Sequence, residues 1–73
     1  MDNRLAQCLL SKADDGGVLE ATHQALAAEL GTAREVVSRQ LKEFERRGLI
    51  RLYRGRIELA ERRGLEALLA RSQ

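Results

Sequence analysis

The feature that most constrains this chain is a single glycine between two segments with helical character. Thr22 is a residue type that caps helices, and it opens a segment to Leu30 with Leu26 and Ala27 on its inner side. Gly31 then ends this helix, because glycine adopts the left-handed backbone conformation without steric cost. A second helix follows at once. Two helices joined by a turn of three or four residues that contains glycine form a helix-turn-helix.

The second helix of this pair is expected over about residues 33–47, with Gly48 as its stop. Its start, Thr32-Ala33-Arg34-Glu35, fits a capping box, in which the Thr hydroxyl and the Glu carboxylate each accept a hydrogen bond from a backbone amide. We therefore expect Thr32 to cap this helix.

The helix over residues 33–47 has two chemically different sides. At about 100° per residue, Val37, Leu41 and Phe44 fall together, which indicates a buried face. The opposite side is long, polar and mostly cationic, with Ser38 at its edge. Its members are Glu35, Arg39, Lys42 and Arg46. The major groove of DNA admits one α-helix, and there Arg pairs with guanine while a carboxylate accepts from cytosine N4. This side therefore matches a base-reading surface.

Glu35 has two interpretations of equal weight. As an acid on a cationic face it is typical of a base reader, because general attraction to phosphates would not favour an acid there. As the last residue of the capping box it would instead stabilise the helix N-terminus and its dipole. The sequence leaves both roles open.

A β-hairpin is predicted after Gly48. Residues 49–53 and 56–59 are short runs that contain Ile, Leu and Tyr, and residues 54–55 make a tight turn between them. The basic side chains on or near its tip are Arg51, Arg54 and Arg56. A helix-turn-helix followed by such a hairpin is a winged helix-turn-helix, with residues 49–59 as the wing.

Two more helices are predicted, one before the helix-turn-helix and one after the hairpin. The first completes a three-helix core, and the second is a C-terminal helix. The further predicted elements are a helix from a cap at Asp2 or Asn3 to about Ala13, a turn at 14–17, an extended segment at 18–21 and a helix at about 61–71. At 73 residues the chain has room for one thin core. We predict one mainly α domain with a small β-hairpin over residues 1–73.

The charge is concentrated in one stretch of the sequence. Between Arg34 and Arg56 there are eight basic and three acidic side chains, a net charge of +5, whereas the rest of the chain carries −3. Such a stretch is typical of a surface that binds a polyanion. A solvated, salt-bridged helix face explains the charge equally well.

The composition also excludes several classes of function. One cysteine, Cys8, and one histidine, His23, permit neither an internal disulfide nor a structural zinc site. We expect Cys8 as a small core residue and His23 as a solvated one. Without a nucleophile–base pair or a glycine-rich phosphate loop, we expect neither an enzyme nor a cofactor. The sequence lacks a membrane span and a signal peptide, which favours the cytoplasm.

Three segments carry a recognisable pattern. They are Leu26-Ala27-Ala28-Glu29-Leu30-Gly31, Arg34-Glu35-Val36-Val37-Ser38-Arg39 and Gly48-Leu49-Ile50. Together they resemble the C-terminal DNA-binding domain of the Crp/Fnr family of bacterial transcription regulators, over about residues 4–69. The resemblance implies sequence-specific binding to double-stranded DNA at an inverted repeat by a homodimer. The 14–17 turn corresponds to the loop with which one branch of the family contacts RNA polymerase, which would make RNA polymerase a further partner. The alternative is a winged-helix protein-interaction module, which would show an exposed apolar patch.

The resemblance also implies roles for individual residues. Base-reading residues would be Glu35, Ser38, Arg39 and Arg34, and the first three would imply a TTGAT-like half-site. Thr22 and Gln24 match positions of the family that bind phosphates. We expect three basic residues to bind phosphates as well, because of their charge and their position: Lys42, Arg54 and Arg56.

Some positions depart from the family pattern. They are Gln40 in place of an apolar residue, Ala60 in place of a capping Asp, and Ala33 and Val36 in place of hydroxyl residues. Family members also carry an N-terminal β-barrel sensor domain and a long dimerisation helix, neither of which is in this chain. We expect the chain to be a fragment of a longer regulator rather than a stand-alone relative.

Overall fold

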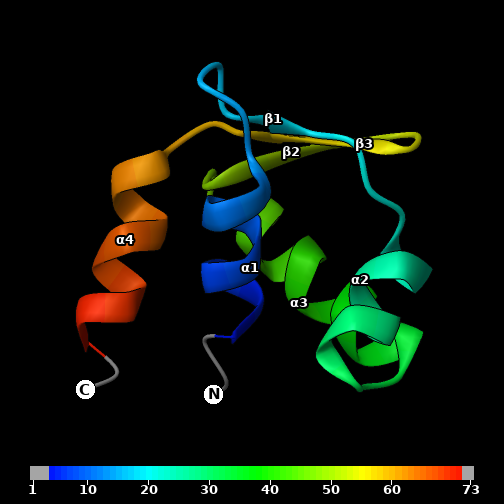
Figure 1. The fold of residues 1–73 in the computed structure, drawn as a ribbon. Helices are drawn as coiled ribbons and strands as arrows, with labels where there is room; N and C mark the ends of the chain where they lie inside the picture. The colour runs from blue at the N-terminus through cyan, green and yellow to red at the C-terminus, as the bar shows by residue number, and fades with distance from the viewer. Residues whose placement is uncertain (1–3, 72–73) are drawn as a thin grey trace.

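The computed structural model describes residues 4–71, which form four helices and one sheet (Figure 1). The elements are α1 (Arg4–Lys12), β1 (Val18–Leu19), α2 (His23–Leu30), α3 (Arg34–Arg46), β2 (Ile50–Tyr53), β3 (Arg56–Leu59) and α4 (Arg62–Arg71). Each predicted helix and both hairpin strands are present within one or two residues of the expected bounds. The predicted winged helix-turn-helix is thus confirmed, and the predicted caps at Asp2 and Asn3 lie outside the described residues.

The sheet has three antiparallel strands in the order β1-β3-β2. Strands β2 and β3 form the hairpin, with Ile50 opposite Leu59 and Tyr53 opposite Arg56, and Leu19 of β1 lies opposite Ile57. In Figure 1 the sheet lies across one end of the helices, and the hairpin turn extends toward the α2 side, away from α4. The wing and the helix-turn-helix therefore share one side of the molecule.

The core draws on every helix and every strand. Its members are Leu5, Ala6, Leu9, Leu19, Leu26, Ala27, Val37, Leu41, Phe44, Ile50, Ile57, Leu59 and Leu65. The predicted buried face of α3 is confirmed, because Val37, Leu41 and Phe44 are each at most 2% exposed. Burying this stripe fixes the rotation of α3, so its polar side must face outward. Within residues 4–71, no helix has the length and apolar character needed to cross a membrane.

The turn between α2 and α3 differs from the sequence prediction at one end. Gly31 adopts the expected left-handed conformation, with φ of 70°. The predicted capping box is wrong, because Ala33 is the N-cap of α3 and makes no side-chain capping bond. The backbone amide of Thr32 donates to the Ala27 carbonyl at 2.9 Å. Thr32 therefore belongs to the closure of α2, and α3 begins one residue later.

Candidate nucleic-acid interface

The outward side of α3 borders an open hollow of about 900 Å³. Its lining residues are Ala33, Arg34, Glu35, Ser38, Arg39 and Lys42. All four predicted base readers and one predicted phosphate-binding residue therefore lie together. Four of these side chains are exposed, and Ser38 is half-buried.

The charged side chains of this hollow have no polar partner within residues 4–71. Neither the Arg34, Arg39 and Lys42 cations nor the Glu35 carboxylate takes part in a hydrogen bond or ion pair there. The capping bond predicted for the Glu35 carboxylate is thus wrong for the free protein, because α3 starts without a side-chain cap. Glu35 does lie in the first turn of α3, where a negative charge favours the helix dipole, as predicted. These groups lie on a helix whose opposite side is packed into the core, and they remain available to an external ligand.

A second hollow, of about 310 Å³, lies between the start of α2 and the hairpin turn. Its polar and aromatic lining consists of Thr22, His23, Gln24, Arg34, Tyr53 and Arg54. Arg34 borders both hollows, so the two form one continuous surface. The Thr22 hydroxyl accepts from the Ala25 amide at 3.0 Å, which confirms the predicted cap of α2.

Arg56 is not brought to either hollow. Its guanidinium lies over the Tyr53 ring, 4.5 Å from the ring centroid. Its Nη2 is 3.6 Å from the Glu58 carboxylate, which offsets part of its charge. Among the predicted phosphate-binding arginines of the wing, Arg54 is therefore the one that faces the same surface as α3.

His23 is not the solvated residue that the sequence predicts. It is half-buried, and its Nδ1 lies 2.8 Å from the Ser38 hydroxyl. The difference arises because α2 and α3 pack against each other, which places the first turn of α2 beside the middle of α3. Spacing along one helix gives no signal of such a contact between helices, so sequence reasoning missed it.

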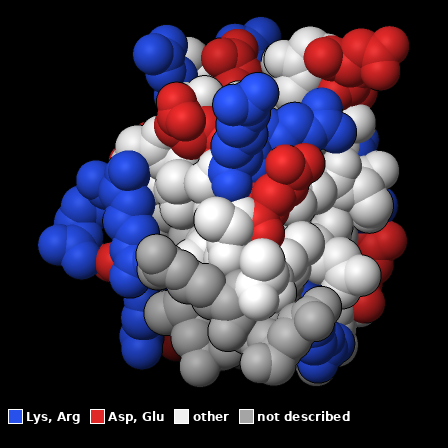
Figure 2. All heavy atoms as spheres, turned by 90° about the vertical axis from the view of Figure 1, so that its left-hand side faces the viewer, with Lys and Arg blue, Asp and Glu red and all other residues white. Residues whose placement is uncertain are grey.

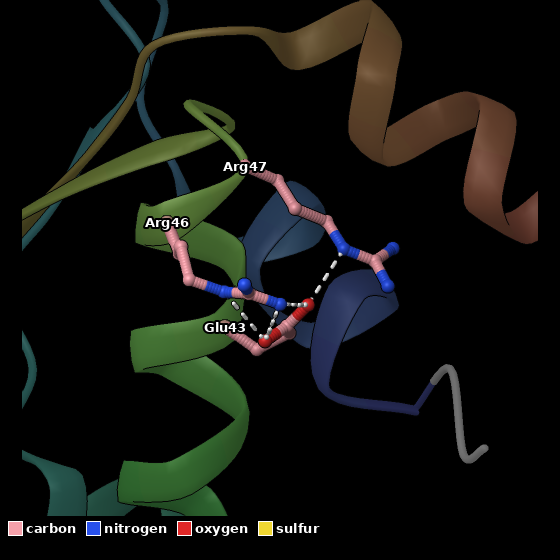
Figure 3. A network of polar contacts seen from close by, with 3 residues as sticks. All are labelled: Glu43, Arg46 and Arg47. Carbon is pink, nitrogen blue, oxygen red and sulfur yellow. Dashed lines mark hydrogen bonds and ion pairs between the residues drawn. The ribbon is translucent and has the colours of Figure 1, made fainter.

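One acid offsets part of the positive charge at the C-terminal end of α3. The Glu43 carboxylate accepts from Arg46 and from Arg47, with closest distances of 2.9 Å to each (Figure 3). These bonds hold the pKa of Glu43 below its ordinary value. Arg46 lies on the side of α3 predicted to be cationic, but its charge is paired with Glu43, unlike the charges of Arg39 and Lys42. The pairs follow the three- and four-residue spacings that the sequence already contains.

Comparison with known proteins assigns the chain to a family. The family model described as the Crp-like helix-turn-helix domain matches residues 3–68. The chain belongs to this family. The resemblance drawn from the helix-turn-helix and hairpin residues is thereby confirmed.

The relatives of this Crp-like domain are transcriptional regulators. The chain is 38% identical to the transcriptional regulator SdrP of Thermus thermophilus over 93% of its own length, and 41% identical to the HTH-type transcriptional regulator Cmr of Mycobacterium tuberculosis over 88%. It spans only 38% and 26% of the lengths of these two proteins.

Solved structures of regulators share the fold of this Crp-like domain. A Crp/Fnr-family regulator from Eubacterium rectale matches with a TM-score of 0.89 at 36% identity, covering 96% of this chain and 33% of the other. A Crp/Fnr-family regulator from Thermus thermophilus matches with a TM-score of 0.83 at 38% identity, covering 93% and 39%.

The face of the Crp-like domain on the α4 side has a different character. Figure 2 shows basic and acidic side chains beside one another there, around a region of uncharged residues.

Polar contacts also join α1 to α2. Lys12 of α1 pairs with Glu29 of α2 at 2.9 Å, which lowers the pKa of Glu29. Burial and the neighbouring Glu29 carboxylate raise the pKa of the Cys8 thiol, whose Sγ is 3.6 Å from Glu29 Oε2. As expected, Cys8 packs against the core, although it is only partly buried.

Proposed function

We propose that this chain binds double-stranded DNA with sequence preference, as the DNA-binding domain of a bacterial transcription regulator. In this proposal α3 enters the major groove, and the turn between β2 and β3 lies on the phosphate backbone. The base readers are Glu35, Ser38, Arg39 and Arg34. The phosphate-binding residues are Thr22, Gln24, Lys42, Arg54 and, from a position outside the two hollows, Arg56.

One observation carries this proposal: the outward side of α3 combines three cations and one carboxylate that have no polar partner within residues 4–71. Arg offers two parallel donors to guanine O6 and N7, and Glu accepts from cytosine N4. A good contact of this kind contributes about 1–3 kcal/mol of discrimination between bases. Arg39 and Glu35 on one face are therefore suited to read adjacent bases.

The DNA site that we propose is an inverted repeat bound by two copies of the domain. The second helix of a helix-turn-helix contacts the bases of one half-site, and dimers bind two half-sites about one helical turn apart. A single domain should then bind one half-site weakly. A homodimer of a longer regulator acting in the cytoplasm, with RNA polymerase as a further partner, belongs to the same proposal, as does the absence of enzymatic activity.

The alternative function is a protein-interaction module on the same fold. It would call for a contiguous apolar surface, yet the large apolar side chains that are well exposed within residues 4–71 are Val36 and Tyr53. Val36 lies on α3 and Tyr53 in the hairpin. The charged surface between these elements favours DNA.

Selection of bound duplexes from a random pool tests the proposal. The 73-residue chain is incubated with the pool at low salt, and the selected duplex is then titrated by fluorescence anisotropy beside a scrambled one. We expect Arg39→Ala to lower the preference for the selected duplex by about tenfold, since a lost base contact is worth about 1–3 kcal/mol.

Arg63→Ala is the matched control, because it removes the same charge from the exposed surface of α4. It should change binding to both duplexes alike. Unchanged preference in Arg39→Ala would overturn the role of that residue. Failure of the wild-type chain to enrich any sequence, even at low salt, would overturn the proposed function.

A further inference from the structure

One side-chain hydrogen bond joins α2 to α3 in the part of the chain that the structure describes. It links His23 Nδ1, in the first turn of α2, to the Ser38 hydroxyl in the middle of α3, across 2.8 Å. Both residues are half-buried, so water competes for this bond less than at an exposed site.

The bond decides where the Ser38 hydroxyl points. A serine inside a helix commonly donates to the carbonyl four residues earlier, which here belongs to Arg34. That choice would turn the hydroxyl back along its own helix. In this structure the hydroxyl is held by His23 instead. A hydroxyl has one donor and two acceptor positions, so the bond to His23 leaves others for a base.

The two partners face different parts of the surface. Ser38 borders the larger hollow, together with Glu35 and Arg39. His23 borders the smaller hollow, between the start of α2 and the hairpin turn. The imidazole therefore lies beside the base-reading side of α3 and holds one of its residues, Ser38.

We propose that His23 is a positioning residue for DNA sequence recognition. It holds the Ser38 hydroxyl toward the base edges and so contributes to discrimination at one base pair without touching a base. This inference rests on the proposed function, since it assigns the source of specificity at that same surface.

Two amide substitutions separate positioning from a general effect of the residue. In Asn the polar atoms are bonded to Cγ, as Nδ1 is in His, whereas in Gln they lie one bond further out, as Nε2 does. His23→Asn can therefore keep the bond to Ser38, and His23→Gln is a matched variant that places its amide elsewhere. Both are uncharged and polar, and they suit a half-buried position at a helix start.

The assay is competition anisotropy with the selected duplex and a set in which each base pair is changed in turn. Ser38→Ala should lower discrimination at one base pair by about threefold to tenfold, the range of a single hydrogen bond. His23→Gln should lower discrimination at the same base pair by a similar factor. The double variant should lose no more than Ser38→Ala alone, and His23→Asn should stay within about twofold of the wild type.

Several results would overturn the inference. Full discrimination in His23→Gln would do so, as would equal losses in His23→Asn and His23→Gln. Uniform weakening on all duplexes in His23→Gln would make His23 a phosphate contact instead. Each of these leaves the proposed function standing, whereas a wild-type chain with no sequence preference would overturn both.

Discussion

Replacing Gly31 by Ala tests whether the turn between α2 and α3 depends on backbone conformation alone. Gly31 has φ of 70°, and a Cβ built there would meet nothing within 4 Å. The folded-state penalty is then the left-handed conformation itself, about 1–2 kcal/mol for an L-residue. Alanine also lowers the conformational entropy of the unfolded chain, and this stabilises the folded state by about 0.4–1 kcal/mol. The net loss of about 1 kcal/mol corresponds to a Tm lower by roughly 6 °C for a domain of this size.

Thermal unfolding followed by far-UV circular dichroism measures this shift. Gly16→Ala is the matched control, because Gly16 lacks a positive φ and its added Cβ would lie 3.4 Å from Asp14 Oδ1, an ordinary contact. It should leave the Tm unchanged or raise it by a few degrees. Gly31→Asn should lose less than Gly31→Ala, since Asn tolerates the left-handed region. A Tm of Gly31→Ala equal to or above that of the wild type would refute the reasoning.

Three further outcomes are expected. Arg54→Ala should weaken binding to all duplexes alike and make the salt dependence shallower by about 0.9 in slope, whereas a loss confined to the selected duplex would make Arg54 a base reader. Above about pH 4.3, the free energy of unfolding in urea should be larger for the wild type than for Glu43→Gln. This difference should shrink as the pH drops through the lowered pKa of Glu43, because protonation removes the charge that pairs with Arg46 and Arg47. A difference that does not change with pH would contradict the pairing. Alkylation of Cys8 at about pH 8 should be slower than that of a free cysteine, because burial and Glu29 raise the pKa of its thiol, and Glu29→Gln should speed it only in part; an unchanged rate would contradict the contact with Glu29.

The elements of this fold follow from local signals. Val37, Leu41 and Phe44 share one side of a helix at any tertiary arrangement, so the buried and outward sides of α3 were predictable. Gly31 and Thr22 act on backbone bonds within a few residues, and both behave as expected. The capping box failed because a competing local bond, from the Thr32 amide to the Ala27 carbonyl, shifted the start of α3.

The sequence by itself determined which side chains α3 presents outward, because helical period and the apolar stripe leave no other rotation. The packing of α2, α3 and the hairpin decided the rest. The crossing of α2 over α3 sets His23 against Ser38. The position of the hairpin turn beside the start of α2 makes Arg34 border the hollow that Arg54 also lines. Such neighbours are 15 and 20 positions apart, and their contact depends on how separate elements pack around a shared core. The hydrophobic period of one helix does not depend on how that helix packs against other elements, so only the tertiary structure could show these contacts.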